Sequence, residues 1–301
     1  MQAAVVPILP QLSLKRILYA TDFSASSQAC LAVVGAIARR YHAEVYIANV
    51  RPPMPYTMAT PEAVCIMENQ RECATRHDME MLLHSKELTG VAASAIVETG
   101  DPAEELRRAV RDYDIDLAVV GTHGRTGLMR LLMGSLAEEL FRSLSCPVLT
   151  IGPHLSRRKL DLNSVNTILC PTDLSSESRT GFVNVAALAC EFQAKIVVLH
   201  VIPGSDALSA HALEAAVEAR RAAQRIFSPD VDPRCPLEIV VDFGDPAERI
   251  LAAAREHHAA VIALGVRQAG EPTTHFRNTV AYRVVLEAEC PVLTSRSPEK
   301  W

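Results

Sequence analysis

The sequence predicts an α/β protein made of two tandem, doubly wound domains of the Rossmann type, each with a mostly parallel sheet. Short apolar segments alternate with helical segments along the chain, and this alternation is typical of parallel strands covered by helices on both faces. The length of 301 residues suits about two domains. The third observation is that the chain repeats itself.

The repeat aligns residues 17–50 with residues 168–201 without a gap, at an offset of 151 that pairs Thr21 with Thr172 and Asp22 with Asp173. The later parts, including "GDPAE" and "CPVLT", align at an offset of 144. The second copy is therefore shorter between its second and third strands. We place the domains at 1–153 and 160–301, on either side of a joint with Pro153 and a charged run.

The elements of the first copy follow in order from local patterns. A β-rich run at 16–20 leads through a polar turn to a helix at about 27–42 and a strand at 44–50. A longer helical segment, about 61–88, precedes a third strand at 93–98. Strand and helix periodicities differ, so these assignments rest on the spacing of apolar residues.

The second half of each copy begins with a helix-start signature. In "DPAE", Asp101 suits the N-cap, Pro102 the first helical position and Glu104 the reciprocal capping position. That helix ends near Asp114, and an apolar strand at 116–120 follows. A helix at 135–144 and a strand at 146–151 complete the unit, and the second copy has the same pattern.

The composition favours a cytoplasmic globular protein. A net charge of -5 gives no electrostatic reason to expect nucleic acid or an anionic membrane as a partner. No apolar stretch approaches the roughly 20 residues that span a bilayer. The first residues lack a basic start and contain Pro7 and Pro10, which argues against a secretory signal. None of the eight cysteines forms Cys-x-x-Cys, so neither a disulfide framework nor a zinc site is predicted.

A glycine-rich stretch, "GTHGRTGLMRLLMGS" from Gly121 to Ser135, follows the fourth strand. Glycine clusters mark either turns with positive φ or a backbone that approaches a ligand closely. Ser135 and Glu138 form a capping box at the start of the next helix, and such a helix start attracts anions. Arg125 adds positive charge, whereas His123 is either a phosphate contact or an exposed loop residue. The residues alone leave open whether the stretch holds phosphate.

A family resemblance favours the phosphate interpretation. Gly121-x-x-Gly124, nine residues and then Gly134-Ser135, between "DLAVVG" and "SCPVLTI", resemble the ATP-binding signature of the universal stress protein family. "YATDFS" and "GDPAEEL" in the first copy, and "CPTDLS" and "FGDPAERI" in the second, resemble that family too. The resemblance implies a five-stranded parallel fold of the adenine nucleotide alpha hydrolase type, with ATP in its crevice.

The resemblance also implies roles for individual positions. Asp22 would lie on the ribose or base side, and the backbone around Val50 would contact the adenine edge. The glycine stretch would hold the phosphates, with Mg²⁺ or Mn²⁺ among their oxygens. The predicted nucleotide-binding residues are Thr21, Asp22, Val50, Gly121, His123, Gly124, Arg125, Gly134, Ser135 and Leu136.

The second copy departs from this pattern in its phosphate half. It keeps Gly265, but Gln268, Glu271 and Asn278 stand where the first copy has glycine. A carboxylate near a phosphate is unfavourable, so we predict one ATP per chain and a structural or regulatory second domain. The resemblance further implies that the last strands of the two copies pair as an internal pseudo-dimer, and a homodimer of whole chains remains open.

No nucleophile, catalytic base or paired carboxylates can be assigned near the glycine stretch. We therefore expect a stress-response regulatory or sensor module that acts on an unidentified protein partner and hydrolyses ATP slowly, if at all. Two alternatives remain open. One is a scaffold that needs no nucleotide, and the other is a genuine ATPase or adenylate hydrolase.

Overall fold

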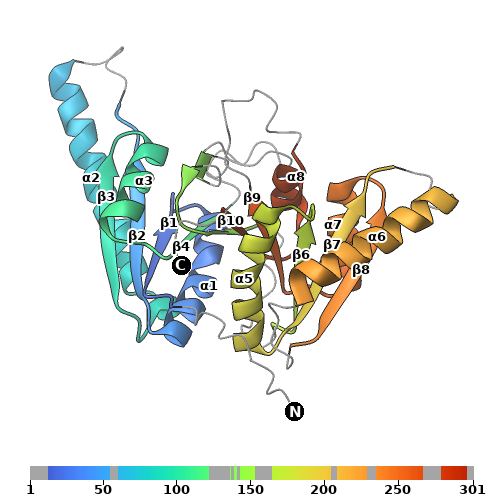
Figure 1. The fold of residues 1–301 in the computed structure, drawn as a ribbon. Coiled ribbons are helices and arrows are strands. Elements are labelled where there is room, and N and C mark those ends of the chain that lie inside the picture. The colour runs from blue at the N-terminus through green and yellow to red at the C-terminus, as the bar shows by residue number, and fades with distance from the viewer. Residues whose placement is uncertain are drawn as a thin grey trace. The chain divides into compact units, whose positions relative to one another are not determined.

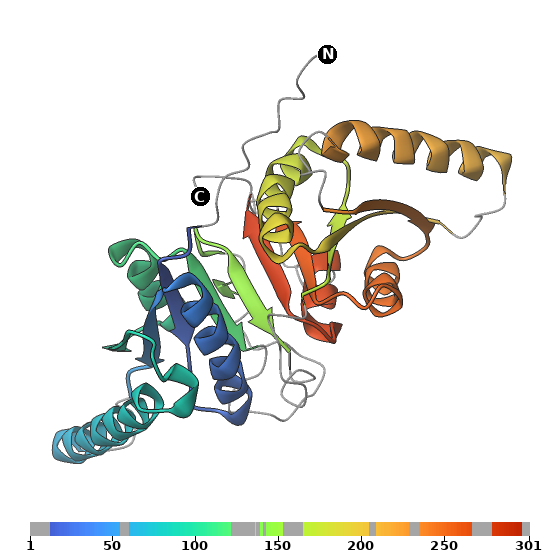
Figure 2. The same ribbon diagram turned by 90° about the horizontal axis from the view of Figure 1, so that it is seen from below.

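The computed structural model describes residues 13–54, 60–121, 136, 139–140, 143–152, 165–204, 209–228, 235–266 and 279–296. Its contacts divide the chain into two compact units, one of residues 14–148 and one that holds the chain from residue 149 onward. Within each unit, helices cover both faces of a parallel sheet (Figure 1 and Figure 2). The α/β class and tandem arrangement are thus confirmed, while the internal pseudo-dimer stays a prediction.

The first unit has the strand order β3-β2-β1-β4, with all pairs parallel. The predicted helix at 61–88 is wrong in its last part, because the helix ends at Leu83. A short 3-10 turn then leads to Gly90, whose φ of 76° suits glycine. The elements are β1 (Arg16–Ala20), α1 (Ala25–Tyr41), β2 (Glu44–Arg51), α2 (Pro61–Leu83), η2 (Lys86–Leu88), β3 (Ala93–Thr99), α3 (Pro102–Asp112), β4 (Leu117–Gly121) and, at the boundary of the units, β5 (Val148–Ile151).

The second unit repeats this order as β8-β7-β6-β9-β10, again parallel. The pairs of β8 with β7, β7 with β6 and β6 with β9 have their counterparts in the first unit, so the sequence repeat is also a structural one. The elements are β6 (Thr167–Thr172), α5 (Ser176–Phe192), β7 (Lys195–Ile202), α6 (Ala210–Phe227), β8 (Leu237–Phe243), α7 (Pro246–Glu256), β9 (Val261–Val266), α8 (Val280–Glu287) and β10 (Val292–Arg296).

Each sheet buries apolar side chains on both faces. In the first unit, Leu18 and Ala118 pack against α3 and against Leu140 of the following helix. In the second unit, Ile168 and Ile196 pack against α5 and α6, where the rings of Phe182 and Phe227 lie 4.6 Å apart. Among the described helices, none is long and apolar enough to cross a membrane.

The predicted helix starts form as local hydrogen bonds. The Asp101 Oδ1 accepts a hydrogen bond from the Glu104 N–H at 2.9 Å, and Pro102 takes the first helical position of α3. Asp245 caps α7 in the same way, also at 2.9 Å. The "GDPAE" motif therefore fixes the start of the same helix in both units.

Left-handed backbone conformations also repeat between the units. Among the described residues, six residues other than glycine have positive φ, and they form three equivalent pairs. Such conformations strain a side-chain-bearing residue, so their repetition indicates that the fold demands them. The pairs are Phe23 with Leu174, His42 with Gln193, and Asp114 with His258.

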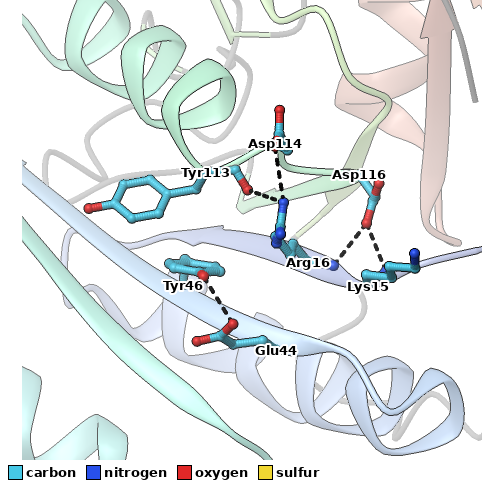
Figure 3. A network of polar contacts seen from close by, with 7 residues as sticks. All are labelled: Lys15, Arg16, Glu44, Tyr46, Tyr113, Asp114 and Asp116. Carbon is cyan, nitrogen blue, oxygen red and sulfur yellow. Dashed lines mark hydrogen bonds and ion pairs between the residues drawn. The ribbon is translucent and has the colours of Figure 1, made fainter.

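Polar contacts tie β1 to β4 at the amino-terminal edge of the first sheet (Figure 3). The Asp116 Oδ2 accepts hydrogen bonds from the backbone N–H groups of Lys15, at 2.7 Å, and Arg16, at 2.9 Å. The rings of Tyr46 and Tyr113 lie beside this contact with centroids 4.8 Å apart. The network lies at the opposite edge from the predicted nucleotide site.

Candidate functional site

Four of the predicted residues meet at the carboxyl edge of the first sheet. Thr21 and Asp22 follow β1, Val50 lies near the end of β2, and Gly121 ends β4. Because β1 pairs in parallel with both β2 and β4, these ends lie at one edge of the sheet. Open parallel sheets bind ligands at this edge.

The turn after β1 is held by its own side chains. The Phe23 N–H donates to the Thr21 Oγ1 at 3.0 Å, and the Ser24 N–H donates to the Asp22 Oδ1 at 3.0 Å. These bonds stabilise Phe23 at a φ of 61°. Ser24 then caps α1 by accepting from the Ser27 N–H. The Asp22 carboxylate is thus fixed at the start of a helix.

Buried polar side chains of β1, β2 and α1 form hydrogen bonds that hold this turn in place. The Tyr19 hydroxyl donates to the Ser27 carbonyl at 2.7 Å, and the hydroxyls of Thr21 and Ser27 lie 3.1 Å apart. Burial raises the pKa of Tyr19, so its hydroxyl stays protonated and remains a donor. The Asn49 Nδ2 donates to the Thr21 carbonyl at 2.8 Å. Together these bonds join the ends of β1 and β2 to α1.

Asn49 is a site residue that the sequence analysis missed. Its side chain is only 7% exposed, and its Oδ1 has no hydrogen-bond partner among the described residues. A carbonyl can only accept, so the amide nitrogen must face Thr21. The sequence signal was a polar residue in the otherwise apolar end of the strand, "YIANV".

The second unit builds the same turn after β6. The Thr172 Oγ1 accepts from the Leu174 N–H, and the Asp173 Oδ1 accepts from the Ser175 N–H, both at 3.0 Å. Leu174 has a φ of 63°. His200, the counterpart of Asn49, places its Nδ1 3.0 Å from the Thr172 carbonyl.

The two turns differ at one serine. In the first unit, the Ser27 Oγ donates to the Ser24 carbonyl at 2.9 Å. In the second unit, the equivalent Ser178 Oγ donates to the Asp173 Oδ1 at 2.6 Å. The equivalent serines therefore donate to different groups, a backbone carbonyl in the first unit and the aspartate carboxylate in the second.

A pocket of about 430 Å³ opens at the carboxyl edge of the second sheet. This volume falls within the range of about 300–1,000 Å³ that is usual for small-molecule sites. Asp173 and Val201, the counterparts of Asp22 and Val50, both line it. The full lining is Pro171, Thr172, Asp173, Ser175, Ser178, Leu199, His200, Val201, Pro203, Pro246, Ile250, Leu264, Gly265, Val280, Ala281 and Ser295.

An ion pair joins the two helices that border this pocket. The Arg283 Nη1 of α8 lies 2.8 Å from the Oδ1 of Asp245, the N-cap of α7. The hydrogen bond from the Glu248 N–H, together with Arg283, lowers the pKa of Asp245. In the first unit, Glu139 stands at the position of Arg283 and lies 3.7 Å from Arg107. The ion pair between these two helices therefore has its charges exchanged between the units. The helix after the third strand supplies the carboxylate in the second unit and the arginine in the first.

The predicted phosphate half of the first site lies outside the described residues, as do the three substituted glycine positions of the second copy. Leu136 is described: it is helical, and its side chain packs against the core beside α3. Thr279, the counterpart of Ser135, caps α8 by accepting from the Tyr282 N–H at 3.3 Å. The predicted site residues outside the description are His123, Gly124, Arg125, Gly134 and Ser135.

Comparisons with known sequences agree with the repeated architecture. The universal stress protein family matches the chain twice, over residues 13–152 and 164–296. Universal stress protein MJ0531 of Methanocaldococcus jannaschii is 32% identical over 140 residues, which cover 46% of this chain and 81% of that protein. Universal stress protein MJ0577 of the same organism is 26% identical over 152 residues, covering 46% and 94%.

Solved structures show the same fold over nearly the whole chain. A universal stress protein from Archaeoglobus fulgidus superposes with a TM-score of 0.65 at 18% identity, covering 95% of this chain and all of that one. A protein of unknown function, PA1789 from Pseudomonas aeruginosa, gives a TM-score of 0.62 at 15% identity, covering 95% and 93%. The chain belongs to the universal stress protein family and carries the family's domain twice.

Proposed function

We propose that this protein is a cytoplasmic stress-response regulatory module that binds ATP in its first unit and hydrolyses it slowly, if at all. The observation that carries the proposal is the convergence of Thr21, Asp22, Val50 and Gly121 at one carboxyl edge. Membership of the universal stress protein family and the glycine stretch that follows Gly121 support it.

The residues at this edge suit the base and ribose half of a nucleotide. Asp22 is an acceptor fixed by its turn, and it would receive hydrogen bonds from ribose hydroxyls or from the base amino group. The backbone of Val50 would contact the adenine edge. The glycine stretch and the helix start at Ser135 would hold the phosphates, and a bound Mg²⁺ or Mn²⁺ would neutralise part of their charge.

The differences between the copies support one ATP per chain. Glu271 and Asn278 stand at glycine positions of the first copy, and a carboxylate there would repel a triphosphate. Nucleotide bound in the first unit would favour one arrangement of the glycine stretch over others, and so change the surface offered to a protein partner.

The test is calorimetric titration of Mg-ATP into the full chain and into two full-length variants. Gly124→Gln combined with Gly134→Asn places the second copy's residues in the first, and Asp173→Asn alters the second copy only. We expect one ATP for the wild type and for Asp173→Asn, and none for the double variant. Absence of binding in the wild type, or binding that the double variant retains, would refute the proposal and favour the scaffold.

A turnover assay separates the regulatory module from an enzyme. We expect release of phosphate to be slow compared with the typical kcat range of about 1–1,000 s⁻¹, because no base has been assigned. Rapid multiple turnover that Asp22→Ala abolishes would instead identify an ATPase.

A further inference from the structure

The outward face of α2 brings together two metal-ligating side chains that the nucleotide site does not use. Cys73 and His77 are four residues apart in this helix, and both are exposed (Figure 1 labels α2). The inward face packs into the core through Thr75 and Met79, which are 8% and 2% exposed. Residues four apart on a helix are surface neighbours, with Cβ atoms about 5–6 Å apart. The thiol and the imidazole can therefore reach the same ion, a spacing that helical metal motifs use.

Both side chains are available as ligands. Neither Cys73 nor His77 has a side-chain hydrogen bond or an ion pair among the described residues. Arg76, the cation between them in the sequence, forms an ion pair with Glu72 at 2.5 Å. A metal ion binds the thiolate and the neutral imidazole, and it releases the protons that these groups carried. An ion arriving from solvent would therefore displace no structural contact of either side chain.

The pair is not required by the fold. The helix α6 has the same place in the second unit, after the second strand, and its residues 210–227 contain no cysteine. Cys65 of α2 is exposed as well, but the residue four positions on is Asn69, whose Nδ2 lies 3.9 Å from the Cys65 Sγ. An amide is a poor ligand for a soft metal. Cys65 therefore offers one soft ligand, whereas Cys73 has an imidazole beside it.

The number and the kind of ligands decide which ion suits this face. Among the described residues, no three His, Cys, Asp or Glu side chains gather so that they could hold a metal ion. Zinc sites take three or four protein ligands, so Cys73 and His77 alone do not complete one. A thiolate is a soft ligand that selects Cu(I), and Cu(I) is stable with two ligands in a linear arrangement. The pair thus matches Cu(I) in both respects.

We propose that Cys73 and His77 form a two-coordinate site for Cu(I) on the outward face of α2. The ligands are the Cys73 thiolate and one imidazole nitrogen of His77. The ion enters and stays as Cu(I), so no oxidation or reduction takes place, and the proton of the thiol passes to solvent. The site is separate from the proposed ATP site, which lies at the carboxyl edge of the sheet.

The experiment titrates Cu(I) into the full-length protein in the absence of oxygen, in competition with the chromophoric chelator ferrozine. It compares the wild type with Cys73→Ser, His77→Asn and the matched control Cys65→Ser. His77→Asn gives Cys73 the neighbour that Cys65 already has, so it tests the pair rather than the thiol alone. We expect the wild type and Cys65→Ser to retain one Cu(I) more per chain than the other two variants. Thermal unfolding checks that each variant is folded.

The affinity and the choice of metal complete the test. Removing either ligand should weaken the site by about a hundredfold or more, because the loss of an outer-shell partner alone costs about 10–100-fold. The ultraviolet Cu(I)–thiolate band should be smaller in Cys73→Ser than in Cys65→Ser, and Zn(II) should not displace Cu(I).

Four results would overturn the proposal. They are a wild type that retains no Cu(I) against ferrozine, wild-type affinity in His77→Asn, an equal loss in Cys65→Ser and Cys73→Ser, and displacement of Cu(I) by Zn(II). No nucleotide is present in the assay, so its outcome is independent of whether the first unit binds ATP.

Discussion

Replacing Asn49 by leucine tests whether this buried side chain serves the site or the fold. The change removes the donor to the Thr21 carbonyl, and a buried carbonyl that loses its partner costs about 1–3 kcal/mol. It also removes Oδ1, an acceptor without a partner among the described residues, whose desolvation costs a similar ~1–3 kcal/mol. Because the two effects oppose each other, the free energy of unfolding should change by less than about 1 kcal/mol.

Binding should respond differently from stability. Without the Asn49 bond, the turn that carries Asp22 loses its side-chain hydrogen bond to β2 and keeps the backbone bond from the Thr21 N–H to the Ala48 carbonyl. Loosely supported sites bind poorly, so ATP affinity should fall about tenfold or more. Asn49→His, which introduces the side chain used by the second unit, keeps a donor to Thr21 and should retain affinity. Urea denaturation and calorimetry measure the two quantities. A stable Asn49→Leu protein with wild-type affinity, or a loss of stability above about 3 kcal/mol, would refute this reasoning.

Three other predictions concern parts of the structure away from the predicted nucleotide site. Asp116→Ala, which introduces the second unit's residue, should lower the free energy of unfolding by about 1 kcal/mol, since it removes the acceptor for two backbone amides of the first unit. No loss in urea denaturation would mean that water replaces both bonds. The pKa of Asp245 is lowered, so its stabilisation is present above the unfolded pKa of about 3.9 and is lost as the pH falls toward the lower folded value. Asp245→Asn should therefore show a shallower fall of Tm below about pH 4 than the wild type, and equal slopes for the two proteins would contradict this. Cys65 and Cys73 are exposed, while burial raises the pKa of four other thiols to about 12. A thiol reagent followed by mass spectrometry should therefore label these two first, and equally fast labelling of a buried cysteine would disprove it.

The predictable part of this fold is encoded in local patterns. The alternation of strands and helices and the "GDPAE" caps each depend on residues within a few positions of one another, and the repeat shows the same local patterns a second time along the chain. Asp101 and Asp245 therefore occupy the predicted N-cap positions. The edge that gathers Thr21 and Gly121 was predictable only on the condition that β1 and β4 are neighbours, which the strand order now supplies.

The unpredicted part depends on contacts between distant residues and on strain. Asn49 and Thr21 are 28 positions apart, as are His200 and Thr172, and no local pattern pairs them. The left-handed conformation of Phe23 runs against the preference of a bulky residue. It is maintained by side-chain bonds on either side that a propensity argument does not count.

The hydrogen bond to the threonine carbonyl shows how two equivalent turns keep the same shape with different side chains, Asn49 in the first unit and His200 in the second. Asparagine and neutral histidine each offer one donor and one acceptor, so either side chain can satisfy the buried carbonyl at the strand end with its donor. The fold constrains only that donor, and the acceptor can differ in chemistry without cost to the turn. Ser27 and Ser178 show a similar difference. Each hydroxyl donates a hydrogen bond within its turn, but Ser27 donates to the Ser24 carbonyl and Ser178 donates to the Asp173 carboxylate. A duplicated domain can thus change what its crevice recognises while the bonds that shape the crevice remain in place.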